Sequence, residues 1–351
     1  MTPRERIDAV LSHRETDRPP CDLWCTPEVM ADLLSHFGTE SEEEVYEGLG
    51  IDKIAWVEAP HRRRAQSSGK PGVVSDEWGV GRRWVDYGKG RYQEVVGYPL
   101  SGIEESGRLD EHRWPDPELY DFEALAAGCR RYAAWYRMLT FVSIFEVYCW
   151  LKPMDQSLID LYVNPDFAHA LIEKILGVQR LYIENALAEP GAEFEMVYLS
   201  DDFGMQDRLL ISLEKWREFF QEPYRELVAL IKASGKRIFY HSDGAAFEVL
   251  AQMVQLGVDV INPIQHNCPG MERDRLKSSL GERVVFHGAV DNQQVLPFGT
   301  PDDVRREVRE NIRTLGAGGG YIVAPCHMIQ PGTPMENILA LYDEVHHHAG
   351  G

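Results

Sequence analysis

Short runs of hydrophobic residues alternate along the chain with longer segments in which hydrophobic residues recur every three or four positions. Short runs rich in Val, Ile, Phe and Tyr are typical of buried parallel strands, and the longer spacing is typical of helices. The eight runs are Cys21–Trp24, 53–58, 140–145, 195–199, 237–240, 258–261, 284–286 and 321–324. Eight strand–helix units predict a (β/α)8 TIM barrel, and an open doubly wound sheet is the alternative.

One segment, residues 72–102, departs from this alternation. Aromatic and β-branched residues alternate there with polar ones around the sequence Asp86-Tyr-Gly-Lys-Gly, which favours a turn. The pattern predicts a β-hairpin insertion after the second strand. Loops after the strands of a TIM barrel lie over its catalytic face, so we expect residues 1–351 to form one domain with this hairpin beside the barrel mouth.

Composition and charge exclude several classes of protein. The 351 residues are 44% hydrophobic, which is enough for a large core, and the formal net charge is −20. An acidic surface repels phosphates and therefore disfavours binding to nucleic acid or to an anionic membrane. The chain has no apolar stretch of about 18 residues, its first residues do not resemble a signal peptide, and its six cysteines are sparse. These features predict a reduced, cytoplasmic enzyme.

Polar side chains gather at the carboxyl ends of the predicted strands, where TIM barrels carry their active sites. His241 and Asp243 follow the fifth strand two residues apart, so their side chains are expected on the same side. Together with His327 after the last strand, or Cys326 in reserve, they predict a divalent metal site. Histidine and carboxylate ligands suit Zn²⁺ with an open fourth position. The alternative is a hydrogen-bonded cluster that binds substrate without a metal.

Further polar residues at the strand ends are candidates for catalysis or for binding the substrate. The candidates for acid–base catalysis are Asp201, Asp202, Glu146 and His287. Two adjacent carboxylates can raise one pKa and so provide a proton donor. Neighbouring side chains in an extended chain point apart, so only one of the two aspartates is expected to face the cavity. The alternative to a catalytic role is that one of them caps the next helix. The candidates for substrate contact are Gln206, Asp291, Gln330 and Trp24.

Six motifs carry a family resemblance. They are Thr2-Pro-Arg-Glu-Arg, Asp17-Arg-Pro-Pro, Asp201-Asp-Phe-Gly-Met-Gln, His241-Ser-Asp-Gly, Phe286-His-Gly-Ala-Val-Asp and Cys326-His-Met-Ile-Gln-Pro-Gly-Thr-Pro. In this order they resemble the uroporphyrinogen decarboxylase superfamily over nearly the whole chain. The resemblance implies a TIM barrel with its cleft at the strand ends. It also implies one of two activities, the decarboxylation of the heme pathway or methyl transfer by zinc enzymes from a corrinoid protein to a thiol or tetrahydrofolate.

The resemblance to the decarboxylase branch is incomplete. That branch carries an Arg-Gln-Ala-Gly-Arg segment after its first strand, and its arginines hold the carboxylates of the porphyrinogen. This chain reads Trp24-Cys-Thr-Pro-Glu at that place, without arginine, although His327 matches the histidine of the decarboxylase's last strand. Burying unpaired carboxylates is costly, so heme-pathway decarboxylation is disfavoured.

The methyltransferase branch binds zinc through His-x-Cys after the fifth strand and a Cys after the eighth. His241 matches the histidine, and Asp243 and His327 take the places of the two cysteines. This set is harder than the family's thiolate set, so it would activate a thiol less strongly, and water or a carboxylate more readily, than that set does. The resemblance implies a metal-dependent methyltransferase of corrinoid-linked one-carbon metabolism, with zinc and with a methyl-corrinoid protein as donor. Members of the family occur as dimers and as monomers, so the resemblance leaves the assembly open between a homodimer and a monomer.

Two other classes of function stay open. One is a lyase, decarboxylase or hydrolase that acts on a small polar compound with acid and base from the carboxylates and histidine named above. The other is a barrel that binds a ligand without turnover. The metal content of the purified protein would distinguish the methyltransferase from both.

Overall fold

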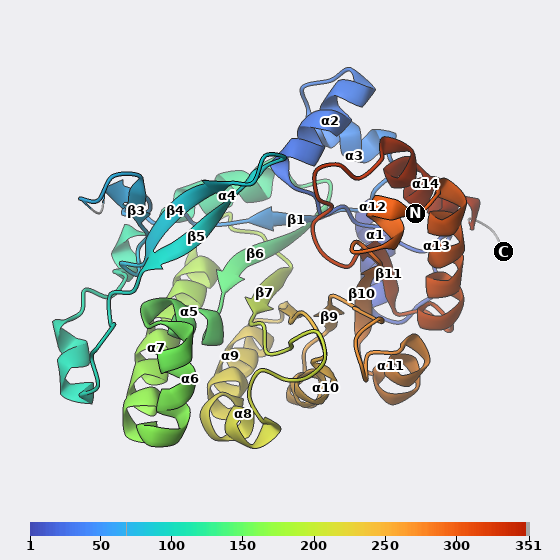
Figure 1. Cartoon of the computed structure of the whole chain (residues 1–351). Helices are drawn as coiled ribbons and strands as arrows, with labels where there is room; N and C mark the ends of the chain where they lie inside the picture. Colours follow the sequence, from blue (N-terminus) through green and yellow to red (C-terminus); the bar gives the residue numbers. More distant parts are fainter. Residues whose placement is uncertain (68, 349–351) are drawn as a thin grey trace.

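A computed structural model describes residues 1–67 and 69–348 of the chain. Its main feature is a seven-stranded parallel sheet in the order β1-β6-β7-β8-β9-β10-β11, with helices along its outer side (Figure 1). The strands are β1 (Ile54–Val57), β6 (Tyr136–Val142), β7 (Met196–Ser200), β8 (Arg237–His241), β9 (Val260–Asn262), β10 (Val285–Val290) and β11 (Tyr321–Pro325). The order follows the chain, as expected for repeated strand–helix units.

The helices alternate with these strands. They are α1 (Pro3–Leu11), α2 (Pro27–Phe37), α3 (Glu42–Gly48), α4 (Phe122–Arg131), α5 (Phe145–Leu151), α6 (Met154–Val163), α7 (Pro165–Ala188), α8 (Leu213–Phe219), α9 (Gln221–Ala233), α10 (Phe247–Leu256), α11 (Arg273–Leu280), α12 (Val295–Phe298), α13 (Pro301–Leu315) and α14 (Met335–His347). Within the described residues, no helix combines the length and the apolar character needed to cross a bilayer.

Residues 20–25, which contain the first predicted strand, lie beside β11 without forming a regular strand. They make only isolated bridges, between Cys21 and Val323 and between Cys25 and Ile329. The amide of Val323 donates to the carbonyl of Pro20 at 2.9 Å, but proline has no N–H to extend the ladder. On the other side, the amide of Asp52 donates to the carbonyl of Cys21 at 2.9 Å.

The predicted strand at residues 140–145 is wrong in its position. The strand β6 spans Tyr136–Val142, and Phe145 already begins helix α5. The side chain of Asp201, which follows β7, accepts hydrogen bonds from the backbone amides of Ile144 at 2.9 Å and Glu146 at 2.6 Å. This cap comes from a distant part of the chain, so the local sequence gave no sign that a helix starts here.

A second sheet occupies the region where the sequence predicted one hairpin. It contains four antiparallel strands, β2 (Gln66–Ser67), β3 (Val73–Ser75), β4 (Gly81–Asp86) and β5 (Arg91–Gly97). The strands β4 and β5 pair from Gly81 to Asp86 and are joined through the residues around the predicted turn, where the amide of Tyr87 donates to the carbonyl of Gly90 at 3.1 Å. Figure 1 shows these strands to one side of the parallel sheet.

Hydrophobic side chains fill the inner side of the parallel sheet as well as its helical side. Every strand of the sheet contributes to one buried cluster on the inner side. Its members are Ile7, Val10, Leu11, Trp24, Ile54, Tyr136, Met138, Met196, Tyr198, Phe239, Val260, Val285 and Ile322. Residues from α1 belong to this cluster, so the N-terminal helix packs directly against the interior. The strand ends are thereby held at one common edge.

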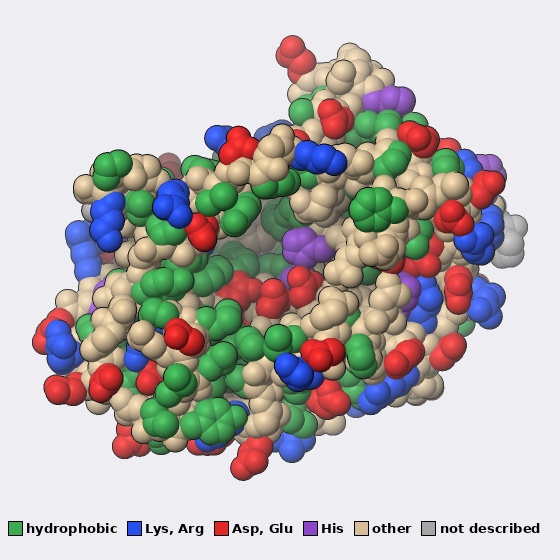
Figure 2. Space-filling model, viewed as in Figure 1, with side chains coloured by type: hydrophobic (Ala, Val, Ile, Leu, Met, Phe, Trp, Pro, Cys, Tyr) green, Lys and Arg blue, Asp and Glu red, His purple; other side chains and the backbone are tan. Residues whose placement is uncertain are grey.

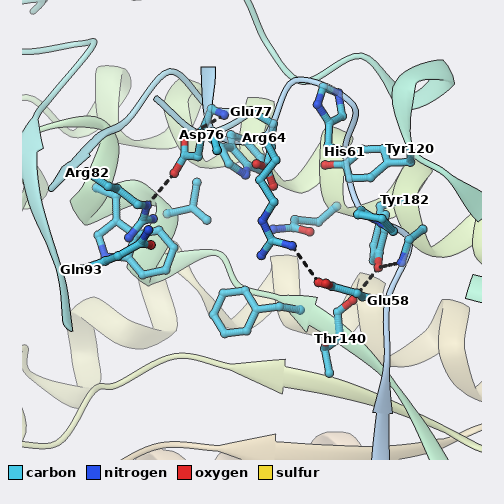
Figure 3. Close-up of a pocket in the computed structure, with 18 of the residues that line it drawn as sticks. Glu58, His61, Arg64, Asp76, Glu77, Arg82, Gln93, Tyr120, Thr140 and Tyr182 are labelled. Carbon is cyan, nitrogen blue, oxygen red and sulfur yellow. Dashed lines mark hydrogen bonds and ion pairs between the residues drawn. The ribbon is translucent and has the colours of Figure 1, made fainter. Parts of the chain in front are cut away.

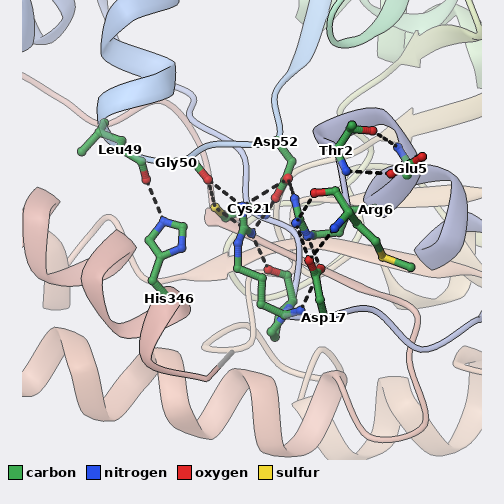
Figure 4. Close-up of polar contacts among 12 residues, drawn as sticks. Thr2, Glu5, Arg6, Asp17, Cys21, Leu49, Gly50, Asp52 and His346 are labelled. Carbon is green, nitrogen blue, oxygen red and sulfur yellow. Dashed lines mark hydrogen bonds and ion pairs between the residues drawn. The ribbon is translucent and has the colours of Figure 1, made fainter. Parts of the chain in front are cut away.

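A buried acid fixes the N-terminal segment to the sheet (Figure 4). Asp52 is fully buried just before β1 and pairs with the guanidinium groups of Arg6 and Arg18. It also accepts from the amide of Cys21 at 2.9 Å. The side chain of Arg6 reaches Asp17 as well, at 2.7 Å. Helix α1 and the segment beside β11 therefore depend on one carboxylate.

We expect Asp52→Asn to lower the free energy of unfolding by about 3–5 kcal/mol, because it leaves two buried arginine contacts without their negative charge. Urea denaturation followed by circular dichroism measures this change. Asp32→Asn, at an exposed position on α2, is the control and should change stability by less than about 0.5 kcal/mol. Similar midpoints for the two variants would show that the buried pairs contribute little.

Candidate metal centre

Two histidines and an aspartate meet at the carboxyl end of the parallel sheet. His241 is the last residue of β8, Asp243 follows two residues later, and His327 comes two residues after β11. One ligand atom from each residue lies within 4.8 Å of the others. His241 Nε2 is 3.8 Å from Asp243 Oδ1, and His327 Nε2 is 4.0 Å from Asp243 Oδ2. The structure therefore brings together the three predicted ligands.

The carboxylates of this cluster have unused capacity for a ligand. Asp243 Oδ1 is buried and has no hydrogen-bond partner among the described residues. Asp202 Oδ1 lies 3.6 Å from His241 Nε2 and accepts from the amide of Asp243 at 2.8 Å. Burial raises the pKa of Asp243, against the opposing influence of His241. Two imidazoles and one or two carboxylates are a donor set that fits Zn²⁺, and the orphaned oxygen needs a positive partner.

Cys326 does not face this cluster. Its thiol is buried and donates to the carbonyl oxygen of Ile264 at 3.2 Å, whereas the side chain of the next residue, His327, points to Asp243. Successive side chains in an extended segment point to opposite sides. Burial also raises the pKa of the Cys326 thiol well above its usual range, which disfavours the thiolate. The histidine is thus the candidate ligand from this strand.

A chain of buried polar side chains leads from His241 into the interior. His241 Nδ1 is 2.6 Å from Asn262 Oδ1, and Asn262 Nδ2 is 2.8 Å from His287 Nδ1. His287 Nε2 is in turn 3.2 Å from Asp22 Oδ2. Asn262, His287 and Asp22 are all fully buried. We call these three residues the relay.

The relay determines which nitrogen of each histidine carries the proton. Asn262 Nδ2 also lies 3.4 Å from the carbonyl oxygen of His287, which only accepts, and this fixes the orientation of the amide. The amide oxygen must then accept from His241 Nδ1, and the amide nitrogen must donate to His287 Nδ1. In its neutral form, the imidazole of His241 then carries its lone pair on Nε2, the nitrogen that faces Asp243. This is the tautomer that a metal ligand requires.

A buried ion pair ends the relay. Lys53 Nζ is 3.1 Å from Asp22 Oδ1, and the indole of Trp24 donates to Asp22 Oδ2 at 3.0 Å. Burial alone would raise the pKa of Asp22, but Lys53 and His287 outweigh it and lower the pKa to about 2. Burial lowers the pKa of His287, so this imidazole is neutral at neutral pH. A fixed carboxylate therefore orients His287, and through it Asn262 and His241.

The predicted acid–base residues fall into two groups. Asp201 and His287 are fully buried. Burial raises the pKa of Asp201 to about 6, against hydrogen bonds from Tyr224 and Ser143 that lower it. Asp202 and Glu146 are more accessible. Asp201 caps a helix, but this is the earlier α5 and not the next helix that the sequence indicated, and Asp202 is the aspartate that lies 3.6 Å from His241.

Glu146 lies in the first turn of α5 and not at a strand end. Burial raises the pKa of its carboxyl group well above the usual range, and the negative charges of Asp201, Asp202 and Asp243 raise it further. A carboxyl group whose pKa is raised in this way keeps its proton to a higher pH and can act as a proton donor. The arrangement places an acid beside the candidate metal ligands.

The four residues predicted to contact substrate make contacts within the protein. Gln206 Nε2 lies 3.4 Å from the sulfur of Cys268, and Gln330 Nε2 donates to the carbonyl of Met328 at 3.1 Å. Asp291 accepts from the amides of residues 293 and 294 at the start of α12. Trp24 is buried, with its ring centroid 6.0 Å from that of His241 and 5.4 Å from that of His287. The Trp24 ring thus packs against both histidine rings.

Next to this cluster is a large cavity with aromatic walls, which we call the aromatic cavity (Figure 3). Its volume is about 710 Å³, and its residues come from β1, β6, β7, the antiparallel sheet and the segments between them. They are Trp56, Glu58–His61, Arg64, Ala65, Val74, Asp76–Trp78, Arg82, Gln93, Tyr120, Thr140, Phe141, Val147, Trp150, Gln179, Tyr182 and Tyr198. Figure 2 shows the hollowed face, where acidic and histidine side chains lie among hydrophobic ones.

Sequence reasoning missed most of the residues that support the site. Asp22, Lys53 and Asn262 stood next to or within predicted strands and carried no spacing that linked them to His241. The one available signal was a charged residue inside a hydrophobic run, such as the aspartate in Cys21-Asp-Leu-Trp, because buried charges require partners. The aromatic cavity depends on how the two sheets pack together, and the sequence pattern does not predict this packing.

Comparisons with known proteins agree with this architecture. The uroporphyrinogen decarboxylase (URO-D) family model matches residues 143–348, more than half of the chain. Uroporphyrinogen decarboxylase of Coxiella burnetii (strain Dugway 5J108-111) is 26% identical over 190 residues, which are 53% of this chain and 48% of that protein. The enzyme of the same name from Anaeromyxobacter sp. (strain Fw109-5) is 30% identical over 187 residues, or 53% and 49% of the two chains. The chain thus spans about half the length of the curated relatives it matches.

A solved structure matches over a greater length. A methyltransferase from Methanosarcina mazei superimposes with a TM-score of 0.70 at 16% sequence identity, and the match covers 99% of both chains. At this identity the likeness shows the fold alone. The match to the family model and the resemblance of the motifs together show that this chain belongs to the uroporphyrinogen decarboxylase family.

Proposed function

We propose that the protein is a metal-dependent methyltransferase of corrinoid-linked one-carbon metabolism. The observation that carries the proposal is the convergence of His241, Asp243 and His327 within 4.8 Å, with one oxygen of Asp243 buried and unpartnered among the described residues. We also infer that residues 20–25 close the parallel sheet into a barrel, which leaves these ligands at its mouth. The fold shared with the M. mazei methyltransferase supports the proposal.

His241, Asp243 and His327 would hold zinc, with Asp202 close enough to bind or to orient the fourth ligand. When bound, the metal would act as a Lewis acid that lowers the pKa of the methyl acceptor and makes it a better nucleophile. Neither thiolate of the family's zinc methyltransferases is present, so the harder set favours an oxygen or nitrogen acceptor over a thiol. A methyl-corrinoid protein is the proposed methyl donor.

The surroundings of the site disfavour decarboxylation of a porphyrinogen. Arg64 and Arg82 line the aromatic cavity, but each is already paired, with Glu58 at 2.9 Å and with Asp76 at 2.8 Å. No arginine follows Trp24 at the first strand position. Several substrate carboxylates would then enter an acidic site without positive partners, which is costly.

Zinc binding tests the proposal directly. His347 and His348 can bind zinc by themselves, so we design the titration in a parent protein that carries His347→Gln and His348→Gln. We expect this parent to bind one equivalent of Zn²⁺ and His241→Ala to bind it at least about 100-fold more weakly, because a direct ligand is lost. His36→Ala, at an exposed position on α2, is the control. A parent protein that binds no stoichiometric metal would overturn the proposal.

The hydrogen bond between His241 and the relay leads to a separate prediction about zinc affinity. Asn262→Leu removes the acceptor for His241 Nδ1, so we expect zinc to bind about 10–100-fold more weakly, as when an outer hydrogen-bond partner of a ligand is lost. Asn262→Asp keeps an acceptor and should retain most of the affinity. Nitrogen NMR of the metal-free protein should show His241 protonated on Nδ1 and His287 on Nε2. Equal zinc affinity in both variants would contradict the role of this hydrogen bond.

The raised pKa of Glu146 favours a second candidate function, a lyase or hydrolase in which this residue is the general acid. Its carboxyl group should be protonated at neutral pH, because burial and three neighbouring carboxylates disfavour its charge. Infrared spectroscopy of the metal-free protein should detect the protonated carboxyl band, and Glu146→Gln should remove it. In Asp202→Asn the band should disappear at a lower pH, because one negative neighbour is gone. An ionised Glu146 at pH 7 would argue against this alternative.

A further inference from the structure

Aromatic side chains make up a third of the residues that line the aromatic cavity. Seven of its side chains are aromatic, namely Trp56, Trp78, Tyr120, Phe141, Trp150, Tyr182 and Tyr198. Such rings present a negative face, which attracts a cation within about 6 Å of the ring centre. One wall already uses this interaction, because the guanidinium carbon of Arg82 lies 4.4 Å from the centre of the Trp150 ring. A volume of about 710 Å³ is the size of a pocket for a small molecule.

The charged groups of the aromatic cavity leave one acid unmatched. Arg64 pairs with Glu58 and Arg82 pairs with Asp76, as Figure 3 shows. Glu77 has no ion pair among the described residues, and its Oε2 is buried without a hydrogen-bond partner there. Burial raises the pKa of Glu77, and the neighbouring Asp76 raises it further, against the opposing positive charges of Arg64 and Arg82. A positive ligand would relieve both effects.

The remaining groups around the aromatic cavity do not supply a free positive charge. Burial lowers the pKa of His61, so its imidazole is neutral at neutral pH. Burial raises the pKa of Tyr198, which lines the cavity, and the negative charges of Asp202 and Asp243 at the strand ends raise it further. An anionic ligand would find both arginines already neutralised. A cation would meet aromatic faces, an unpaired acid and a negative field.

We propose that the aromatic cavity binds a small organic cation, an amine with methyl or other apolar substituents, through its ring faces and the carboxylate of Glu77. Apolar substituents fit the aromatic walls, and the positive nitrogen satisfies the unmatched charge. A bare metal ion or a strongly hydrated cation would gain little from these rings. The class of ligand therefore follows from the walls and from the charge together.

The aromatic cavity is adjacent to the candidate metal centre. Tyr198 lines the cavity, and its ring centre is 5.9 Å from that of His241. The aromatic cavity therefore borders the candidate ligands through the ring of Tyr198. Binding of the cation needs no metal and so does not depend on the proposed function. Only the chemical fate of the bound molecule rests on that function. Failure of the zinc titration would thus leave the inference standing.

A matched series of ligands tests the proposal on metal-free protein by calorimetry and by quenching of tryptophan fluorescence. The probes are benzyltrimethylammonium, neopentylbenzene, in which carbon replaces the charged nitrogen, and benzoate. We expect the cation to bind at least about tenfold more tightly than its neutral isostere, and benzoate to bind weakest. Equal affinity for benzyltrimethylammonium and neopentylbenzene would show that the cavity selects apolar ligands without regard to charge. Tighter binding of benzoate than of the cation would show that it selects anions. Either result would overturn the proposal.

Two variants locate the binding site. Glu77→Gln keeps the shape of the side chain and should weaken binding of benzyltrimethylammonium about three- to tenfold while neopentylbenzene is unaffected. Trp56→Leu keeps an apolar wall but removes a ring face, and should have the same selective effect. Glu123→Gln, exposed on α4, is the matched control and should change nothing. Unchanged cation affinity in both Glu77→Gln and Trp56→Leu would refute the assignment.

Discussion

The negative charge of Asp22 is the constraint on which the centre of the molecule depends. This carboxylate is completely shielded from solvent, where an unpaired charge would be prohibitively costly. Lys53, the Trp24 indole and His287 satisfy it, and the backbone carbonyl of the same residue accepts from the hydroxyl of Tyr342 on α14 at 3.1 Å. One residue thus joins the N-terminal segment, the first and tenth strands and the last helix. The orientation of His241 follows from these partners.

The candidate metal ligands were predictable because they follow from local rules, whereas the contacts that join the relay residues were not. His241 and Asp243 are separated by two residues at a strand end, and this spacing is visible in any reading of the sequence. The contact between Asp22 and His287 joins residues 265 positions apart. Such a contact depends on strand order and register, and hydrophobic periodicity determines neither. The positions of most strands followed from their composition, since buried parallel strands are short and rich in β-branched residues.

The error at residues 140–145 has the same physical origin. Phe145 and its neighbours are hydrophobic enough for a strand, but the carboxylate of Asp201 binds the free amides at the start of a helix. A helix begins where its first amides find acceptors, and here the acceptor comes from the next strand of the sheet. The same contact buries Asp201 and leaves Asp202 beside His241. The structure of one loop therefore decides which of two adjacent acids belongs to the site.

The segment that matches the family model and the segment before it supply different residues at the carboxyl end of the parallel sheet. His241, Asn262, His287 and His327 all fall within residues 143–348, the part that matches the family model. Most of the residues that line the aromatic cavity precede that part, in β1, the antiparallel sheet and the segments that connect them. Changes in these earlier segments can alter the lining of the cavity without moving a candidate metal ligand. The part of the chain that matches the family model thus holds the candidate metal centre, and the part before it supplies most of the neighbouring cavity.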